Sequence, residues 1–462
     1  MIHCFEIGER NLVLDVNSGA LHSVDDAAFY VLKNMAAVES VEKCRELRRV
    51  RRKPAARFSR TSECERTIFQ HSEIPADTPE SLRREIRELI DAGQLFSRDR
   101  ADEAHEHMQN RNPVVKALCL HIAHECNLRC KYCFAGQGNY SENDRGLMPF
   151  EVGKNAIDFL IENSGTRRNL EVDFFGGEPM LNFDVVKKIV AYGREREGEK
   201  NFRFTLTTNA ALLSDENISY INETFDNVVL SLDGRKHVND NMRPFAGGGG
   251  SYDEILPRIK ALADARQGAN YYVRGTYTRH NLDFAADVLH LADAGFKNIS
   301  VEPVVAPADT DYAIREEDLP ALFAEYEKLA LALLAREREG RGIFFFHFET
   351  DLSGGPCIAK RVTGCGAGAE YLAVTPSGRL YPCHQFVGDE KFMLDAPSPA
   401  FSANHVFTKP ECAACWAKFH CGGGCFATAY HMNGDISKPD KISCELMKKR
   451  VECALFMFAE RQ

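Results

Sequence analysis

The sequence contains no apolar run long enough to cross a bilayer, and its first residues lack the basic segment and apolar stretch of a secretory signal. It also has no excess of positive charge, because the formal net charge is -10. Nucleic-acid binding usually requires a broad positive field. We therefore expect a cytoplasmic protein that binds neither a membrane nor nucleic acid.

Disulfide bonds are not expected either, although the chain has 16 cysteines. A reducing compartment keeps thiols free, so metal binding, catalysis or core packing explains them better. Twelve of the cysteines form two groups, one between Cys119 and Cys133 and the other between Cys357 and Cys444. This grouping favours two separate regions of thiol chemistry.

The chain of 462 residues is too long for one hydrophobic core. Its first 100 residues predict a small module, in which two extended stretches form a meander and helical patterns follow. The extended stretches are residues 3–7 and 11–24, the helices are residues 26–35 and 80–93, and Thr78 is a candidate cap of the second helix. A basic run at residues 45–60 lies between the helices and predicts a solvated loop.

Residues 112–340 alternate short apolar strands with longer helical segments, a pattern typical of parallel strands joined by crossover helices. Six units of this kind form an incomplete barrel, whose chemistry is expected on the loops after the strands. The expected strands are residues 117–123, 170–175, 202–207, 227–232, 271–277 and 298–304. The glycine-rich segment 245–250 predicts only a flexible connection. A long helix at residues 316–339 precedes a cysteine-rich region, residues 350–462, with little regular periodicity.

Three thiols, Cys126, Cys130 and Cys133, occupy the loop directly after the first expected strand. A cubane iron-sulfur cluster that is ligated entirely by protein needs four thiolates, so three leave one iron open to another ligand. The alternative is a structural zinc site that takes a distant fourth ligand, such as His121 or His124.

The spacing Cys-x3-Cys-x2-Cys in this position resembles the signature of radical S-adenosylmethionine (SAM) enzymes. In that family the amino and carboxylate groups of SAM chelate the open iron, and one electron splits the sulfonium to give a 5'-deoxyadenosyl radical. The resemblance makes the three thiols the ligands of a catalytic 4Fe-4S cluster and places Tyr132 near the adenine. It also implies an α/β fold, a partial (β/α)6 TIM barrel of the radical SAM type.

Segments after the later strands resemble the SAM-binding elements of the same family. Gly176, Gly177, Glu178 and Pro179 resemble the segment that receives the methionine amino group, where glycine lets the backbone approach a ligand closely. Small polar side chains stand where the ribose is expected: Thr208, Asn209, Ser231 and Asp233.

Arg274, on the fifth expected strand, is a candidate for the SAM carboxylate, because a planar guanidinium can grip a carboxylate with two hydrogen bonds. A structural ion pair is its alternative role. Glu302, on the sixth strand, could bind substrate or simply satisfy that arginine.

The second cysteine group resembles the SPASM extension of radical SAM enzymes, which implies two auxiliary 4Fe-4S clusters and so three clusters in total. By this resemblance Cys365, Cys383 and Cys425 hold the first auxiliary cluster, and the second is held by Cys412, Cys415, Cys421 and Cys444. Cys357 falls outside the usual pattern. It could complete the first cluster, or its absence from that cluster could leave an iron for a substrate thiolate, which the metal would activate. Zinc is the alternative metal.

Three segments, residues 11–26, 364–386 and 444–453, resemble the maturases of six-cysteine SCIFF peptides, which form the thioethers of ranthipeptides, and the resemblance extends over nearly the whole chain. The resemblance implies three regions: a winged-helix-like module at residues 1–100 that recognises a leader peptide by strand addition, the barrel at residues 112–340, and the SPASM domain at residues 350–462. Its partners would be a cysteine-rich ribosomal precursor peptide and an external one-electron donor such as a flavodoxin or ferredoxin.

The reaction implied is hydrogen abstraction from the peptide followed by a bond from a cysteine sulfur to that carbon. The residues do not distinguish an alpha, beta or gamma carbon as the acceptor. His384, beside Cys383, could take a proton or hydrogen bond to a cluster sulfur. Rival functions are a sulfatase-type formylglycine former, a peptide epimerase, or a non-catalytic iron-sulfur or zinc protein.

Overall fold

The computed structural model describes the chain apart from residues 38–73, 100, 110, 112, 141–145 and 350–361. Its centre is a sheet of nine strands in the order β10-β9-β8-β7-β6-β5-β4-β11-β12. The six predicted strands are confirmed as its parallel core: β4 (Ala117–Ala123), β5 (Asn169–Gly176), β6 (Asn201–Thr208), β7 (Asn227–Ser231), β8 (Tyr271–Tyr277) and β9 (Asn298–Pro303).

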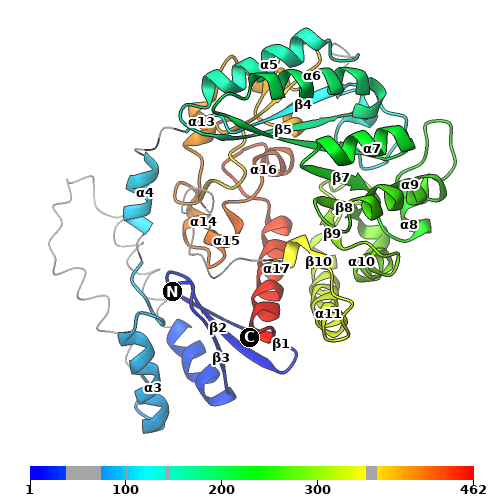
Figure 1. Ribbon diagram of the computed structural model, residues 1–462. Coiled ribbons are helices and arrows are strands. Elements are labelled where there is room, and N and C mark those ends of the chain that lie inside the picture. Colours follow the sequence, from blue (N-terminus) through cyan, green and yellow to red (C-terminus); the bar gives the residue numbers. More distant parts are fainter. Residues whose placement is uncertain (38–73, 100, 110, 112, 141–145, 350–361) are drawn as a thin grey trace.

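Helices follow these strands and cover one face of the sheet (Figure 1). They are α5 (Phe150–Asn163), α6 (Phe183–Arg196), α7 (Asp215–Thr224), α8 (Lys236–Met242), α9 (Tyr252–Ala265), α10 (Phe284–Asp293) and α11 (Leu319–Arg338). Short 3-10 helices join the elements, among them η3 (Pro179–Asn182), η4 (Arg279–Asn281), η5 (Glu316–Asp318) and η6 (Phe346–Phe348).

The two faces of the sheet differ in polarity. Val172 and Phe174 on β5 are fully buried in the core, whereas the alternate residues Asp173 and Phe175 are partly exposed. A parallel sheet that is covered on both faces would be apolar throughout. We call the polar side the inner face, and it is available for chemistry.

The cysteine-rich region joins this sheet, which its weak periodicity did not predict. β11 (Tyr371–Val374) pairs in parallel with β4, and β12 (Leu380–Tyr381) pairs antiparallel with β11. β10 (Phe344–Phe345) extends the opposite edge beside β9. The helices of this region are α13 (Pro399–Ser402), α14 (Pro410–Ala413), α15 (Lys418–Cys421), α16 (Phe426–Asn433) and α17 (Lys441–Glu460).

The N-terminal module has the predicted meander, with β1 (Ile2–Ile7), β2 (Arg10–Asp15) and β3 (Leu21–Val24) in that order. Residues 26–37 are helical, and α3 (Glu80–Asp91) and α4 (Ala101–Gln109) follow. The prediction that Thr78 caps α3 is wrong: the cap position is Pro79, and the buried Thr78 hydroxyl has no partner among the described residues. The basic run at residues 45–60 lies outside the described residues.

The module lies against the C-terminal helix (Figure 1). His3 on β1 hydrogen bonds to Glu452 of α17 at 2.9 Å, and its ring stacks on Trp416 with centroids 3.7 Å apart. Arg10 pairs with Glu460 at 2.6 Å. Among the helices that the structure describes, none combines the length and apolar character needed to cross a bilayer.

Candidate functional site

The cysteine loop, residues 126–133, begins just beyond β4 and carries Cys126, Cys130 and Cys133 in partly buried positions. Burial raises the pKa of Cys126 to about 12, and negative charge on Glu178, Cys130 and Cys133 acts in the same direction. Burial also raises the pKa of Cys130. A bound cationic iron centre would act against this increase and favour the thiolate form of Cys126 and Cys130.

The segment after α8 holds the cysteine loop in place. Backbone hydrogen bonds join the two: Lys131 N–H to Met242 O (2.9 Å), Arg129 N–H to Pro244 O (2.8 Å) and Ala246 N–H to Asn127 O (3.0 Å). Gly250 packs on Asp240, where a Cβ would lie 2.2 Å from the carboxyl carbon. The prediction that residues 245–250 form only a flexible connection is wrong, because this segment supports the thiols.

Gly176 and Gly177 bring the chain after β5 against the start of the cysteine loop. A Cβ on Gly177 would lie 2.1 Å from the carbonyl oxygen of Glu125, and one on Gly176 would lie 2.4 Å from that of Ala123. The backbone N–H groups of Gly177 and Glu178 donate to these same two residues, at 2.7 Å to Ala123 and 2.8 Å to Glu125. The two glycines are thus required by close backbone approach at the site.

The carboxylate of Glu178 is buried and organises the loop after β6. It accepts hydrogen bonds from the Thr208 hydroxyl (2.7 Å), the Asn209 N–H (2.8 Å) and the Met180 N–H (3.1 Å). Burial raises the pKa of Glu178, and these three hydrogen bonds oppose the increase. The Asn209 amide in turn lies 3.7 Å from the sulfur of Cys126. The structure therefore brings the residues predicted for the amino group and the ribose to the first thiol.

Tyr132 and Asp233, predicted for the adenine and the ribose, form a buried chain with Arg243. The Tyr132 hydroxyl donates to Asp233 at 2.8 Å and accepts from Arg243 Nη1 at 2.9 Å. The Thr276 N–H also donates to Asp233, at 3.0 Å. Burial raises the pKa of Asp233 to about 6, although Arg243, Tyr132 and Thr276 act to lower it. Ser231, the last residue of β7, is partly buried and stands two positions before Asp233 in the sequence.

Arg243 is a candidate cofactor residue that the sequence interpretation missed. It is 7% exposed, and its Nε has no hydrogen-bond partner among the described residues. Burial would lower its pKa, but Cys130, Tyr132 and Asp233 outweigh burial and raise it. A buried guanidinium with an unused donor beside the cysteine loop suits a carboxylate ligand. The only sequence signal was an arginine in the same βα unit as Asp233.

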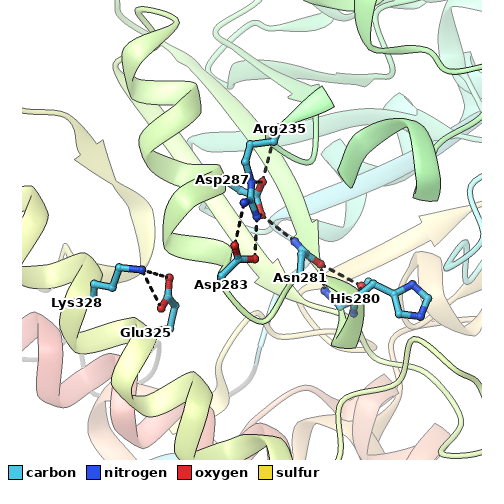
Figure 2. A network of polar contacts seen from close by, with 8 residues as sticks. Arg235, His280, Asn281, Asp283, Asp287, Glu325 and Lys328 are labelled. Carbon is cyan, nitrogen blue, oxygen red and sulfur yellow. Dashed lines mark hydrogen bonds and ion pairs between the residues drawn. The ribbon is translucent and has the colours of Figure 1, made fainter. Parts of the chain in front are cut away.

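An ion-pair network fixes the loop behind Asp233 (Figure 2). Arg235 Nε donates to Asp287 at 2.8 Å, and both Nη groups donate to Asp283 at 2.8 Å. Asn281 also donates to Asp287, at 3.0 Å. Gly234 permits the contact, since a Cβ there would lie 2.3 Å from the Asp287 Cβ. Asp233 is therefore held by a rigid scaffold between β7 and α10.

Arg274 and Glu302 lie on the inner face of β8 and β9 and form an ion pair at 3.6 Å. This is the alternative role considered for Arg274. Burial and the positive charge of Arg274 together lower the pKa of His384 to about 4. Arg274 is therefore engaged with Glu302, whereas Arg243 contacts Tyr132 of the cysteine loop.

The division of the auxiliary thiols into two cluster sets stays a prediction, and their effects on one another's pKa values are compatible with it. Burial raises the pKa of Cys383, and negative charge on Cys425 and Cys365 adds to the increase. Cys444 responds to a different set: burial raises its pKa to about 12, with contributions from Cys421, Cys412 and Cys415. Cys357 lies outside the described residues. All 13 described cysteines are free thiols.

Lys409, also missed from the sequence, is buried between these sets. It is 1% exposed, and its Nζ donates to the Gly423 carbonyl at 3.0 Å. Burial lowers the pKa of Lys409, whereas negative charge on Cys412, Cys421 and Cys444 raises it. A buried cation beside several thiolates would stabilise their negative charge.

His121 and His124, the alternative zinc ligands, are buried and hydrogen bond to each other at 3.0 Å. Tyr140 stacks on His124 and its hydroxyl donates to the Gly176 carbonyl at 3.0 Å. Within the described part of the chain, no three His, Cys, Asp or Glu side chains gather closely enough to hold a single metal ion.

Residues 120–289, from β4 to α10, match the model of the Radical SAM superfamily. This part of the chain is similar to a radical SAM domain. Such a domain implies SAM and a 4Fe-4S cluster as cofactors, and it supports an enzymatic role for the chain.

Two relatives and one solved structure give the range of similarity. An uncharacterized protein of Methanocaldococcus jannaschii is 31% identical over 189 residues, which are 41% of this chain and 62% of that protein. The radical SAM cyclopropyl synthase TigE of Paramaledivibacter caminithermalis is 23% identical over 358 residues, 72% of each chain. The structure of anSMEcpe with bound AdoMet and Kp18Cys peptide shares the fold, with 20% identity and a TM-score of 0.61 over 75% of this chain and 99% of that one.

Proposed function

We propose that this protein is a radical SAM peptide maturase that forms thioether cross-links in a cysteine-rich peptide of the SCIFF type. The observation that carries the proposal is the cysteine loop: three partly buried thiols on a fixed backbone, next to a buried arginine with an unused donor. The described side chains fit a three-thiolate cluster with SAM beside it. The anSMEcpe structure, which holds both AdoMet and a peptide, adds support for a peptide substrate.

Each cofactor contact is assigned to a residue of this site. Cys126, Cys130 and Cys133 would hold the cluster, which supplies the electron that cleaves SAM to a 5'-deoxyadenosyl radical. We assign the SAM carboxylate to Arg243 in place of Arg274, because Arg243 lies beside the cysteine loop and has a buried N–H to offer.

The remaining SAM contacts follow the sequence prediction. Residues 176–179 are assigned to the methionine amino group and Tyr132 to the adenine. Glu178 contributes mainly by holding the next loop, since its carboxylate already accepts three hydrogen bonds. The ribose is assigned to Thr208, Asn209, Ser231 and Asp233.

The second cysteine group is proposed to hold two auxiliary 4Fe-4S clusters in the sets described above, with Cys357 either completing the first set or leaving a position for a substrate thiolate. An external one-electron donor, a flavodoxin or ferredoxin, would supply reducing equivalents. The N-terminal module would bind the leader by strand addition, because neither outer edge of its β1-β2-β3 sheet is paired with another described strand.

Anaerobic purification and cluster reconstitution would test the proposal. We expect a brown protein that releases 5'-deoxyadenosine from SAM under reduction, and a C126A variant that does not. With a short cysteine-rich peptide encoded beside this gene, the product should lose two hydrogens and one alkylatable thiol for each cross-link. An unchanged peptide mass would indicate epimerisation, and a new aldehyde on the peptide would indicate a formylglycine former. A colourless protein that contains zinc would refute the proposed enzymatic function.

A further inference from the structure

Four charged or ionisable side chains meet at the carboxyl ends of β8 and β9, and we call them the inner-face group: Arg274, Glu302, His347 and Arg450. Glu302 is at the centre, with ion-pair distances of 3.6 Å to Arg274, 3.7 Å to Arg450 and 3.7 Å to His347. Arg450 reaches the group from α17 and His347 from η6. The group thus joins the barrel to the C-terminal region.

The inner-face group carries a net positive charge. Both arginines remain protonated in proteins. Burial and the positive charge of Arg450 lower the pKa of His347 to about 3, although Glu302 acts to raise it, so this histidine is neutral near pH 7. One carboxylate therefore faces two guanidinium groups, so one positive charge of the group is not balanced within it.

The arginines also have unused hydrogen-bond donors. Arg450 is 5% exposed; its Nε donates to the Tyr326 hydroxyl at 2.7 Å, but its Nη2 has no partner among the described residues. Arg274 is half exposed, and its 3.6 Å contact with Glu302 is too long for a hydrogen bond. A buried N–H without a partner is costly, so a ligand that accepts from it gains affinity.

The group lies at the edge of the sheet that carries the cysteine loop. Arg274 pairs in register with Ser231 at the carboxyl end of β7, and the loop begins beyond the carboxyl end of β4 in the same sheet. The inner-face group and the cysteine loop therefore share one edge of the sheet, where a bound peptide would lie.

We propose that the inner-face group binds a carboxylate of the substrate peptide, with Arg274 and Arg450 as donors and Glu302 holding the two guanidinium groups apart. This inference rests on the proposed peptide-modifying function and adds a substrate class to it. The carboxylate could belong to an acidic side chain or to the C-terminus of the peptide. Charge-assisted hydrogen bonds of this kind correspond to a preference of about 10-fold to 100-fold over the neutral amide.

The test measures binding of fluorescent heptapeptides to the cluster-loaded, SAM-bound protein by anisotropy. All three peptides contain one cysteine; the first has a glutamate and an amidated C-terminus, the second glutamine with the same amide, and the third glutamine with a free C-terminus. We expect the first or third to bind about 10-fold or more tightly than the second. The one that does identifies the source of the carboxylate.

The variant R274Q should abolish this preference. The control variant R203Q, which replaces an exposed arginine of β6 on the inner face of the sheet, should retain it. Equal affinity for all three peptides, or no binding of any, would overturn the inference. So would an R274Q variant that weakens SAM binding and keeps the peptide preference. Release of 5'-deoxyadenosine by the wild-type protein is measured separately: its absence refutes the proposed function, and its presence without a peptide preference refutes only this inference.

Discussion

The buried carboxyl group of Asp233 predicts how the stability of the protein depends on pH. The carboxyl group is fully buried, and its pKa rises from 3.8 to about 6. The folded chain therefore keeps a proton between pH 4 and 6 that the unfolded chain releases, so the contribution of Asp233 to stability is complete below pH 3.8 and is lost as the pH rises through 6. At about 1.4 kcal/mol for each tenfold change in proton affinity, the loss amounts to ~3 kcal/mol.

The variant D233N has no proton to lose. The difference in unfolding free energy, variant minus wild type, should rise by ~3 kcal/mol between pH 4 and 7 and then level off. Urea unfolding of the metal-free chain at half-unit pH steps measures it. D283N is the control: Arg235 holds the pKa of that exposed carboxyl below its usual value, so its difference curve should stay flat above pH 5. A flat curve for D233N, or one that falls with pH, would refute the reasoning.

Two further substitutions test the cluster sites. G177A places a Cβ 2.1 Å from the Glu125 carbonyl, so it should displace the cysteine loop and reduce bound iron by about one cluster per chain. The control G247A has open space around the added Cβ and should keep its full iron content. K409M removes a buried cation beside the thiols of the second set. The reduction potential of an auxiliary cluster should therefore fall by on the order of 50 mV, as measured by an anaerobic titration followed by electron paramagnetic resonance. An unchanged potential would contradict this role of Lys409.

The barrel could be predicted from the sequence because its strands carry local signals. In β5 the buried Leu170, Val172 and Phe174 alternate with more exposed residues, and the predicted ends lie within one residue of those observed. β11 has only four residues and depends on the free edge of β4, a contact between residues more than 250 positions apart that local pattern does not encode. α17 was missed because its apolar residues do not form a single stripe.

The candidate site likewise contains residues that the sequence could locate and residues that it could not. The thiols of the cysteine loop and the two glycines after β5 are short motifs, so the sequence located them directly. The role proposed for Arg243 depends on its hydrogen bond to Tyr132, which is 111 positions away in the sequence. An isolated arginine on a loop gives no sign in the sequence that it will be buried. Arg450 likewise looks like one basic residue in a run of three, although it is the member that enters the barrel.

The helix α17 explains how distant regions of the chain could act on one peptide. Asp440 caps its first turn at 2.8 Å from the Ser443 N–H, which fixes Cys444 of the second thiol set at the start of the helix. Arg450 enters the inner-face group two turns later, and Glu452 bonds to His3 of the N-terminal module. A helix of 20 residues is a nearly rigid rod of ~30 Å. A leader peptide bound to the N-terminal module is therefore connected, through α17, to the inner-face group that we infer binds the peptide carboxylate. The leader site and the carboxylate site would then stay at a fixed distance from each other.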